Sequence, residues 1–174
     1  MLCLMQRGDR ESVALSAEKG TYVLILRLRQ TRRLTVGRLG SFIFGAGHYA
    51  YLGSAFGPGG VAARVGHHLD RAKSLRWHID YLLTIAEPVE AWFASSDRKL
   101  EKDWADLLPR VPGLHPCIPR FGASDHRRGK TSHLFYSRKR PSFAAFQQRL
   151  SDELEPGIHV RRADIQWPQS RAEE

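Results

Sequence analysis

Apolar and polar residues alternate in several short segments of the chain, and this pattern predicts strands. Residues 21–29 alternate toward their end, which indicates a first strand. Residues 34–44, interrupted by glycines, predict a second strand or a pair of short ones, and residues 47–55 predict a third. The connections between these segments are short. We therefore expect antiparallel pairing, because parallel neighbours would need a long crossover.

The turn residues 57–60 (GPGG) predict the start of a helix. Beyond them, apolar residues recur at helical spacing and are expected to face the core. Three basic residues fall on another face, since side chains three and four positions apart are neighbours on a helix. The apolar positions are Val61, Val65, Leu69 and Ala72, and the basic positions are Arg64, His68 and Arg71.

Two more helices are predicted in the middle of the chain, on either side of a strand. Residues 76–86 give the first helix, residues 89–96 the strand, and residues 98–108 the second helix, for which Asp97 is a candidate cap. The apolar positions are Trp77, Tyr81, Leu82 and Ile85 in the first helix and Leu100, Trp104, Leu107 and Leu108 in the second.

The rest of the chain gives weaker signals. Residues 109–131 are rich in Pro, Gly and Arg and predict an irregular loop, residues 132–137 predict a short strand, and residues 143–150 a closing helix. Beyond Glu155 the chain is charged and weakly patterned, so we expect only a tail or an extension.

The charge of the chain narrows the choice of partner. It has 27 Lys and Arg against 18 Asp and Glu, a formal net charge of +9. Such a surplus favours a polyanionic partner, because basic side chains release counterions from a phosphate backbone; a protein that is basic for other reasons is the alternative. Cys3 and Cys117 are too few for a disulfide framework. Without a recognisable signal peptide or membrane span, we expect a cytoplasmic protein and no membrane partner.

Five short motifs follow one another in an order that resembles a known family. They are GTYVL, YAYLGSA, the pattern GG-x-x-x-R-x-x-x-H at residues 59–68, WHIDYLL, and FGASD followed by SHLFY. Together they resemble the GIY-YIG nuclease superfamily. They look most like one uncharacterised branch of it, a domain of unknown function that also occurs fused to glycosylases of the endonuclease III type. The resemblance covers roughly residues 19–138.

The resemblance implies a small α+β domain in which helices flank a three-stranded antiparallel sheet, here with an extra strand or helix at the C-terminal side. It divides the chain into a lead-in (1–18), a nuclease-like domain (19–138), and a C-terminal helix with a charged tail (139–174). Characterised relatives cut a DNA phosphodiester with one divalent metal ion, so Mg²⁺ or Mn²⁺ is the implied cofactor.

Five residues match the catalytic positions of the superfamily. Tyr22 and Tyr51 stand at the two motif tyrosines, Arg64 and His68 at basic positions of the following helix, and Glu101 at the metal-binding carboxylate. These residue types suit phosphodiester hydrolysis. A carboxylate is a hard ligand for Mg²⁺, arginine grips phosphate in a bidentate fork, and a tyrosine near positive charge can position or deprotonate water.

Each assignment has an alternative. Strand tyrosines more often pack in a core, Arg64 could be a solvated charge, and Asp103 competes with Glu101 as the carboxylate. Glu101 is preferred because it borders the apolar face of its helix. A metal site built from histidines is disfavoured, because adjacent histidines point apart. The residues expected to orient the catalytic groups are His78, Asp80 and His133.

A wider set of residues is expected to contact the nucleic-acid backbone without reading its sequence. For the basic members, solubilising charge is the alternative. The set is Gly53, Arg38, Arg71, Arg127, Arg128 and Lys130, with Arg27, Arg29, Arg32 and Arg33 as further candidates.

Two features depart from the resembled pattern. The branch carries cysteines in the stretch that here reads SDHRRGKTSHL, where this chain has His126 and no cysteine. In addition, 28 residues separate Tyr22 from Tyr51, more than a tight hairpin needs, which leaves the geometry between the two tyrosines open.

The sequence therefore predicts a divalent-metal-dependent DNA endonuclease that acts in DNA repair or on branched or damaged DNA, with a repair protein as a candidate partner. RNA stays open as a substrate. One alternative is a nucleic-acid-binding module that kept the fold and lost catalysis. Another is a hydrolase of a small phosphorylated metabolite, which is disfavoured because GPGG lacks the lysine and hydroxyl of a P-loop.

Overall fold

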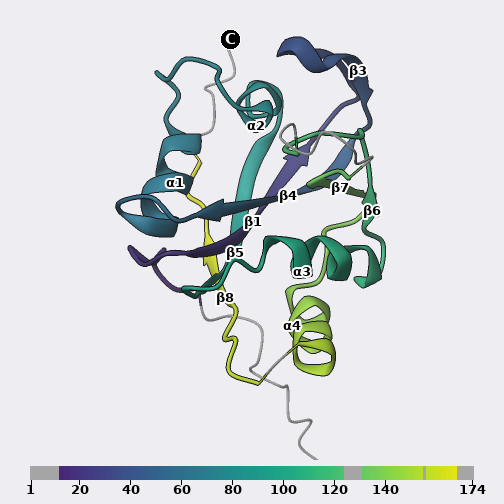
Figure 1. Ribbon diagram of the computed structural model, residues 1–174. Helices are drawn as coiled ribbons and strands as arrows, with labels where there is room; N and C mark the ends of the chain where they lie inside the picture. The colour runs from purple at the N-terminus through teal and green to yellow at the C-terminus, as the bar shows by residue number, and fades with distance from the viewer. Residues whose placement is uncertain (1–11, 124–130, 155, 168–174) are drawn as a thin grey trace, which may run out of the picture.

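Strand β1 (Gly20–Leu28) lies in the interior of a six-stranded sheet with the order β6-β7-β4-β1-β5-β8. In the computed structural model it pairs antiparallel with β4 (Gly47–Ala55) on one side and β5 (Glu87–Ser95) on the other (Figure 1). The α+β class is confirmed, and so are the first and third predicted strands. The structure describes residues 12–123, 131–154 and 156–167.

Three short strands flank the three central ones, and one of them was predicted at residues 132–137. β7 (Leu134–Ser137) pairs with β4, and β6 (His115–Pro116) pairs with β7 at one edge. β8 (Arg161–Asp164) pairs with β5 at the other edge. The expected loop and the expected tail thus each contain a strand. Their apolar signal is weak because β6 has only two residues, one of them a proline, and β8 is largely charged.

Helices cover both faces of the sheet (Figure 1). α1 (Gly60–Leu69) and α2 (His78–Leu82) lie on one face. α3 (Glu101–Leu107), extended by the 3₁₀ turn η2 (Leu108–Arg110), and α4 (Phe143–Glu153) lie on the other. The sheet is therefore the middle of three layers.

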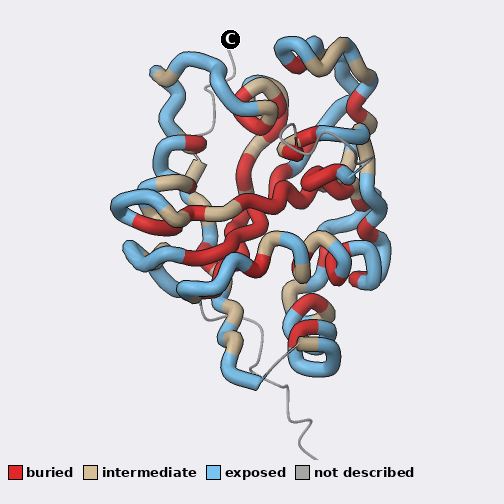
Figure 2. The backbone as a smooth tube through the Cα atoms, in the orientation of Figure 1, coloured by how far each residue is buried: buried red, intermediate tan, exposed pale blue. Residues whose placement is uncertain are grey.

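Side chains of β1 alternate between the two faces, and both faces are buried. Tyr22, Leu24 and Leu26 pack in the cluster with α1 and α2, whereas Val23 and Ile25 pack in the cluster with α3 and α4. Figure 2 shows that buried residues are concentrated along the central strands. Complete burial of each such side chain contributes about 1.5–3 kcal/mol, so the centre of the sheet is a firm base for a site.

A separate hairpin fills the long connection between β1 and β4. β2 (Arg32–Val36) and β3 (Gly40–Phe44) pair antiparallel around a 3₁₀ turn, η1 (Gly37–Leu39), and the hairpin contacts α2. β1 and β4 still pair directly along their whole length. The extra residues therefore do not separate Tyr22 from Tyr51.

Helix α3 buries the apolar side chains that the pattern predicted, but it is not capped as expected. The helix begins at Glu101, and its cap position is occupied by Leu100, so the prediction for Asp97 is wrong. The buried positions are Leu100, Trp104, Leu107 and Leu108.

Helix α1 is shorter than its pattern predicted. It buries Val61 and Val65 but ends at Leu69, where the backbone turns to an extended conformation. Ala72 is therefore exposed rather than part of the core, and Arg71 does not continue the basic face of the helix.

Helix α2 also begins later than expected. The backbone N–H groups of Arg76 and Trp77 donate hydrogen bonds to a carboxylate oxygen of Asp80, at 3.1 and 2.8 Å, which fixes this segment in a turn before the helix. As a result Trp77, predicted to face the core, is 40% exposed.

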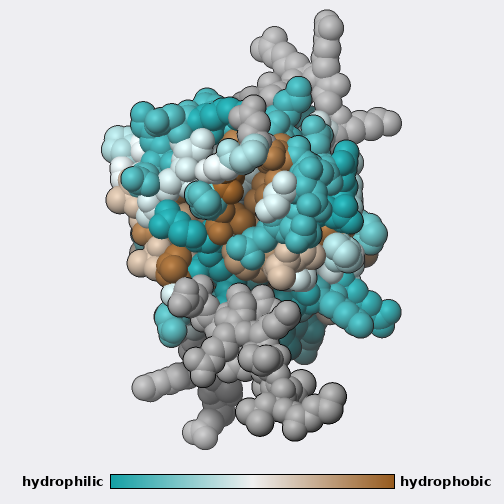
Figure 3. Space-filling view, turned by 90° about the horizontal axis from the view of Figure 1, so that it is seen from below, coloured by the Kyte–Doolittle hydropathy of each residue, from teal (hydrophilic) through white to brown (hydrophobic). Residues whose placement is uncertain are grey.

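Hydrophilic residues make up most of the coloured surface in Figure 3, and apolar residues gather near the middle of this face. Large apolar side chains that are exposed are few within the described ranges: Val13, Ile43, Leu75 and Trp77. None of the helices in the part of the chain that the structure describes is long and apolar enough to cross a bilayer.

Candidate active site

Tyr22 and Tyr51 lie on neighbouring strands and on the same face of the sheet. In the register of β1 and β4, Tyr22 is opposite Gly53 and Tyr51 is opposite Leu24, which makes the tyrosines diagonal neighbours. Both belong to the apolar cluster with α1, and both line one cavity of about 350 Å³. They are core residues and cavity residues at once.

This cavity, called the site cavity below, collects most of the residues that the sequence singled out. Contributions come from β1, β4, α1, α2 and the residues before it, the start of α3, and two residues between β6 and β7. The predicted members are Tyr22, Tyr51, Gly53, Arg64, His68, His78, Glu101 and His133, and the others are Leu52, Ser54, Arg76, Trp77 and Gly122.

Gly53 makes room for the ring of Tyr22. A Cβ atom at position 53 would lie 2.5 Å from the hydroxyl oxygen and the adjacent ring carbon of Tyr22, which is closer than such atoms approach. From the sequence, Gly53 was expected to let the nucleic-acid backbone approach closely. The structure shows that its missing side chain lets the tyrosine ring lie against β4.

A chain of hydrogen bonds runs from Tyr22 through His68 to Asp80. The Tyr22 hydroxyl lies 2.9 Å from Nε2 of His68, and Nδ1 of His68 lies 3.2 Å from a carboxylate oxygen of Asp80. A carboxylate only accepts hydrogen bonds, so Nδ1 carries the proton and Nε2 accepts from the Tyr22 hydroxyl. His68 and Asp80 are 2% and 1% exposed, so little water competes for these bonds.

Burial and nearby charges set the pKa values of His68 and Asp80 in this series of hydrogen bonds. Burial lowers the pKa of His68 below its ordinary value of 6.5; Asp80 opposes this, and Lys73 and Arg64 lower the pKa further. Burial alone would raise the pKa of Asp80, but hydrogen bonds from His68, the backbone of Trp77 and the ammonium of Lys73 hold it well below its usual range. At neutral pH the imidazole is therefore neutral and the carboxylate is charged.

Both site tyrosines stay protonated in this environment. Burial raises the pKa of Tyr22 and of Tyr51 well above 10, and Arg64 lowers both by a smaller amount. The positive charge of Arg64 by itself therefore does not produce a phenolate. The hydroxyl of Tyr22 does lie within hydrogen-bond distance of Nε2 of His68, a neutral imidazole nitrogen that can accept its proton.

Glu101 enters the site cavity from the first turn of α3. Its carboxylate accepts a hydrogen bond from the hydroxyl of Ser54 and lies 3.1 Å from Nδ1 of His133. The side chain is 30% exposed, so it keeps access to the cavity. Asp103, the competing carboxylate, instead pairs with Arg98 at 2.7 Å and does not line the site cavity.

The donor set at Glu101 fits a divalent cation. Mg²⁺ in phosphoryl-transfer sites takes one or two carboxylates and fills its remaining positions with water and substrate phosphate. Within the described ranges, no group of three or more His, Cys, Asp or Glu side chains is placed to hold a metal. Of the histidines, His67 is exposed on α1, and Nδ1 of His78 accepts the backbone N–H of Gly122 at 3.0 Å.

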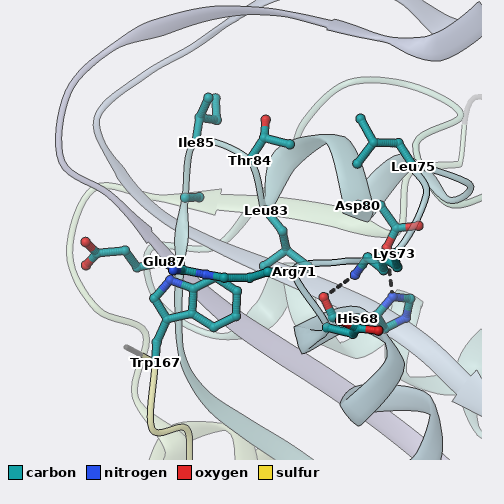
Figure 4. A pocket seen from close by; sticks show the side chains of 12 residues that line it. His68, Arg71, Lys73, Leu75, Asp80, Leu83, Thr84, Ile85, Glu87 and Trp167 are labelled. Carbon is teal, nitrogen blue, oxygen red and sulfur yellow. Dashed lines mark hydrogen bonds and ion pairs between the residues drawn. The ribbon is translucent and has the colours of Figure 1, made fainter. Parts of the chain in front are cut away.

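Two of the predicted phosphate contacts lie away from the site cavity. Arg38 is exposed on η1, at the far end of the β2–β3 hairpin. Arg71 lines a second cavity of about 340 Å³, where its guanidinium stacks on Trp167 at 4.5 Å (Figure 4). The two cavities share only His68 among the described residues that line them. The predictions for Arg127, Arg128 and Lys130 lie outside the described residues.

Five residues of the site cavity were not anticipated from the sequence as site residues: Leu52, Ser54, Arg76, Trp77 and Gly122. Ser54 follows the motif glycine directly, and this adjacency was its only signal in the sequence. Its contact with Glu101 on α3 appears only in the structure. Arg76 and Trp77 precede α2, and their adjacency, a charge beside an aromatic at the end of a polar connection, was the available clue. The guanidinium carbons of Arg64 and Arg76 lie 5.5 and 5.4 Å from the centre of the Trp77 ring.

A family model described as "Domain of unknown function DUF123" matches residues 21–155, which include every residue of the site cavity. The match spans most of the chain, and the chain belongs to this family. No curated protein and no solved structure gives a significant match.

Proposed function

Since membership of a family of unknown function assigns no activity, we propose one from the site: a divalent-metal-dependent DNA endonuclease of the GIY-YIG type, acting on branched or damaged DNA in the cytoplasm. The observation that carries the proposal is the convergence of five side chains on one cavity. Tyr22 comes from β1, Tyr51 from β4, Arg64 and His68 from α1, and Glu101 from α3. Phosphodiester hydrolysis requires such a set of acid–base, phosphate-binding and metal-binding groups.

Arg64 and Tyr51 bind the phosphate in this proposal. The guanidinium of Arg64 donates two parallel hydrogen bonds to the non-bridging oxygens, a geometry that lysine cannot supply. The hydroxyl of Tyr51 stays protonated because burial raises its pKa, so it donates a hydrogen bond to the same phosphate. Together they neutralise and orient the group that is attacked.

Tyr22 and His68 remove the proton from the attacking water. The water proton moves to the Tyr22 oxygen while the Tyr22 proton moves to Nε2 of His68, across the existing 2.9 Å hydrogen bond. The water oxygen bonds to phosphorus, and one P–O bond of the backbone breaks with its electron pair on the departing oxygen. Asp80 stabilises the resulting imidazolium through Nδ1. This shuttle avoids a free phenolate, which burial makes costly.

Glu101 is the residue that would hold the divalent ion. Ser54 and His133 fix its carboxylate by contacts to the two oxygens. When bound, such an ion neutralises charge on the phosphate and on the departing oxygen.

A cleavage assay with matched carboxylate variants tests the proposal. Wild type, Glu101→Gln and Asp103→Asn are incubated with Mg²⁺ and with Mn²⁺ on plasmid, nicked, flapped and four-way DNA. We expect the wild type and Asp103→Asn to cut, because Asp103 lies in a surface ion pair. Glu101→Gln should bind the same DNA and leave it uncut, since a neutral amide is a poor ligand for Mg²⁺.

Two results would contradict the proposal. Cutting by Glu101→Gln at the wild-type rate would show that Glu101 holds no metal ion. DNA binding by all three proteins without cutting on any substrate would identify a binding module with the same fold.

A further inference from the structure

We infer that Trp77, together with Arg64 and Arg76, forms a stacking site for an unpaired nucleotide of DNA at the mouth of the site cavity. The inference deepens the proposed function, on which it rests for the nature of the ligand. It names the substrate class as DNA that carries an unpaired or extruded base beside the phosphate that is cut.

The first observation is an exposed indole at a polar cavity. Trp77 is 40% exposed and lines the site cavity, whereas Trp92 and Trp104 are fully buried in the core. The guanidinium carbons of Arg64 and Arg76 lie 5.5 and 5.4 Å from the centre of its ring, within the range of cation–π attraction. Core packing does not account for an indole in this place.

The second observation is that one buried carboxylate, Asp80, binds both the backbone that carries Trp77 and the imidazole of His68. One oxygen of Asp80 accepts the backbone N–H groups of Arg76 and Trp77, at 3.1 and 2.8 Å. Its other oxygen lies 3.2 Å from Nδ1 of His68. The ring of Trp77 is therefore carried on a backbone that is fixed relative to the Tyr22–His68 pair.

Arg64 determines which ligand fits. It lines the site cavity as the phosphate-binding group and also lies against the Trp77 ring, so a nucleotide whose phosphate reaches Arg64 brings its base close to the indole. In a paired duplex each base is covered by its neighbours. An aromatic side chain can stack only on a base that is unpaired or has been turned out of the helix. Bulges and flaps present such bases, and perfect duplexes do not.

Binding measured in EDTA tests the inference without requiring cleavage. The probes are a perfect duplex and the same duplex with one unpaired 2-aminopurine, whose fluorescence falls when it stacks. The proteins are wild type, Trp77→Phe, Trp77→Leu and, as a matched control, Trp167→Leu, which removes an indole stacked on Arg71 in the second cavity. Base–aromatic stacking corresponds to roughly a 5- to 150-fold change in affinity.

We expect the wild type to prefer the bulged probe by at least about 5-fold and to quench its fluorescence, in the range given by stacking. Trp77→Leu should lose both effects, whereas Trp77→Phe and Trp167→Leu keep the preference. Equal wild-type affinity for the two probes, or a preference that survives in Trp77→Leu, would overturn the inference. The binding assay contains no metal and does not depend on cleavage. A preference for the bulged probe that depends on Trp77 therefore supports the stacking site even if the protein does not cut DNA. Cleavage without this preference would remove the stacking site and leave the proposed function in place.

Discussion

The hydroxyl of Tyr22 lies 2.9 Å from Nε2 of His68, and this contact joins the first strand of the sheet to the first helix across the candidate site. Because the imidazole is neutral and its Nδ1 is bound to Asp80, Nε2 is the nitrogen that can accept the Tyr22 proton in the proposed mechanism. The proposed proton transfer requires Tyr22 and His68 to act as a unit.

Removal of either member should therefore cost as much as removal of both. We expect Tyr22→Phe and His68→Ala each to lower the single-turnover cleavage rate by about 10²–10⁴-fold, the range of general acid–base catalysis. The double variant should be no slower than the slower single variant. Full additivity of the two losses would show that the residues act separately.

The pH dependence of cleavage should report the protonation of His68. His68 must be neutral to accept the Tyr22 proton, and burial lowers its pKa below 6.5, so activity should be constant at neutral pH and fall only below that value. The positive charge of Lys73 also lowers this pKa. Lys73→Met should therefore move the acid limb to higher pH, and Lys139→Met, which removes an exposed lysine, should not. An acid limb that stays in place in Lys73→Met would contradict the assignment.

Asp80 should matter for stability as well as for catalysis. Its carboxylate holds His68, Lys73 and two backbone N–H groups in the interior, so Asp80→Asn should lower the free energy of unfolding by about 3–5 kcal/mol, the cost of breaking a buried ion pair. The exposed pair of Asp103 makes Asp103→Asn a control with a loss of at most about 1 kcal/mol.

The same carboxylate sets the direction of the pH effect on stability. Its folded pKa lies below the ordinary value of 3.8, so its contribution is complete above that pH and is lost as the pH falls through the folded pKa. Chemical denaturation of wild type and Asp80→Asn at several pH values measures both effects. A loss in Asp80→Asn no larger than that in Asp103→Asn would contradict the structural role.

Gly53 and Gly66 should respond in opposite directions to alanine. At Gly53 a Cβ would lie 2.5 Å from Tyr22, so Gly53→Ala should displace the ring, lower stability by about 1–3 kcal/mol and abolish cleavage. At Gly66, on the exposed side of α1, a Cβ meets nothing within 4 Å, and Gly66→Ala should raise stability by about 0.5–1 kcal/mol with activity unchanged. Thermal unfolding and cleavage assays on the two variants check the contrast.

The central strands and the site tyrosines could be predicted from the sequence because their signals are local. Alternation along residues 21–29 marks β1, and the motifs place Tyr22 and Tyr51 on two predicted strands. The direct pairing of these strands came from the structure, because the 28 residues between the tyrosines left their geometry open. β8 could not be predicted, because a charged edge strand pairs through its backbone and its side chains carry no apolar pattern.

The arrangement around Asp80 was beyond sequence reasoning for a different reason. Its partners at positions 68, 73, 76 and 77 belong to a helix end and a turn, whose joint geometry depends on tertiary packing. Helical periodicity predicted Trp77 in the core because the predicted helix includes Trp77, whereas α2 begins one residue later, at His78. The hydrogen bond from the backbone N–H of Trp77 to Asp80 fixes the N-terminal boundary of α2 at this residue.

The most direct test of the central claim is the rate at which the protein cuts a flapped DNA duplex in one turnover, with Mg²⁺ and with EDTA, for wild type, Arg64→Ala and the exposed control Arg149→Ala. If the site cavity is the active site of a metal-dependent nuclease, wild type and Arg149→Ala cut at equal rates and only with Mg²⁺. Arg64→Ala should then be slower by about 10²–10³-fold, the cost of losing one charge-stabilising donor. Cutting that persists in EDTA, or an Arg64→Ala rate equal to that of the wild type, would contradict the account.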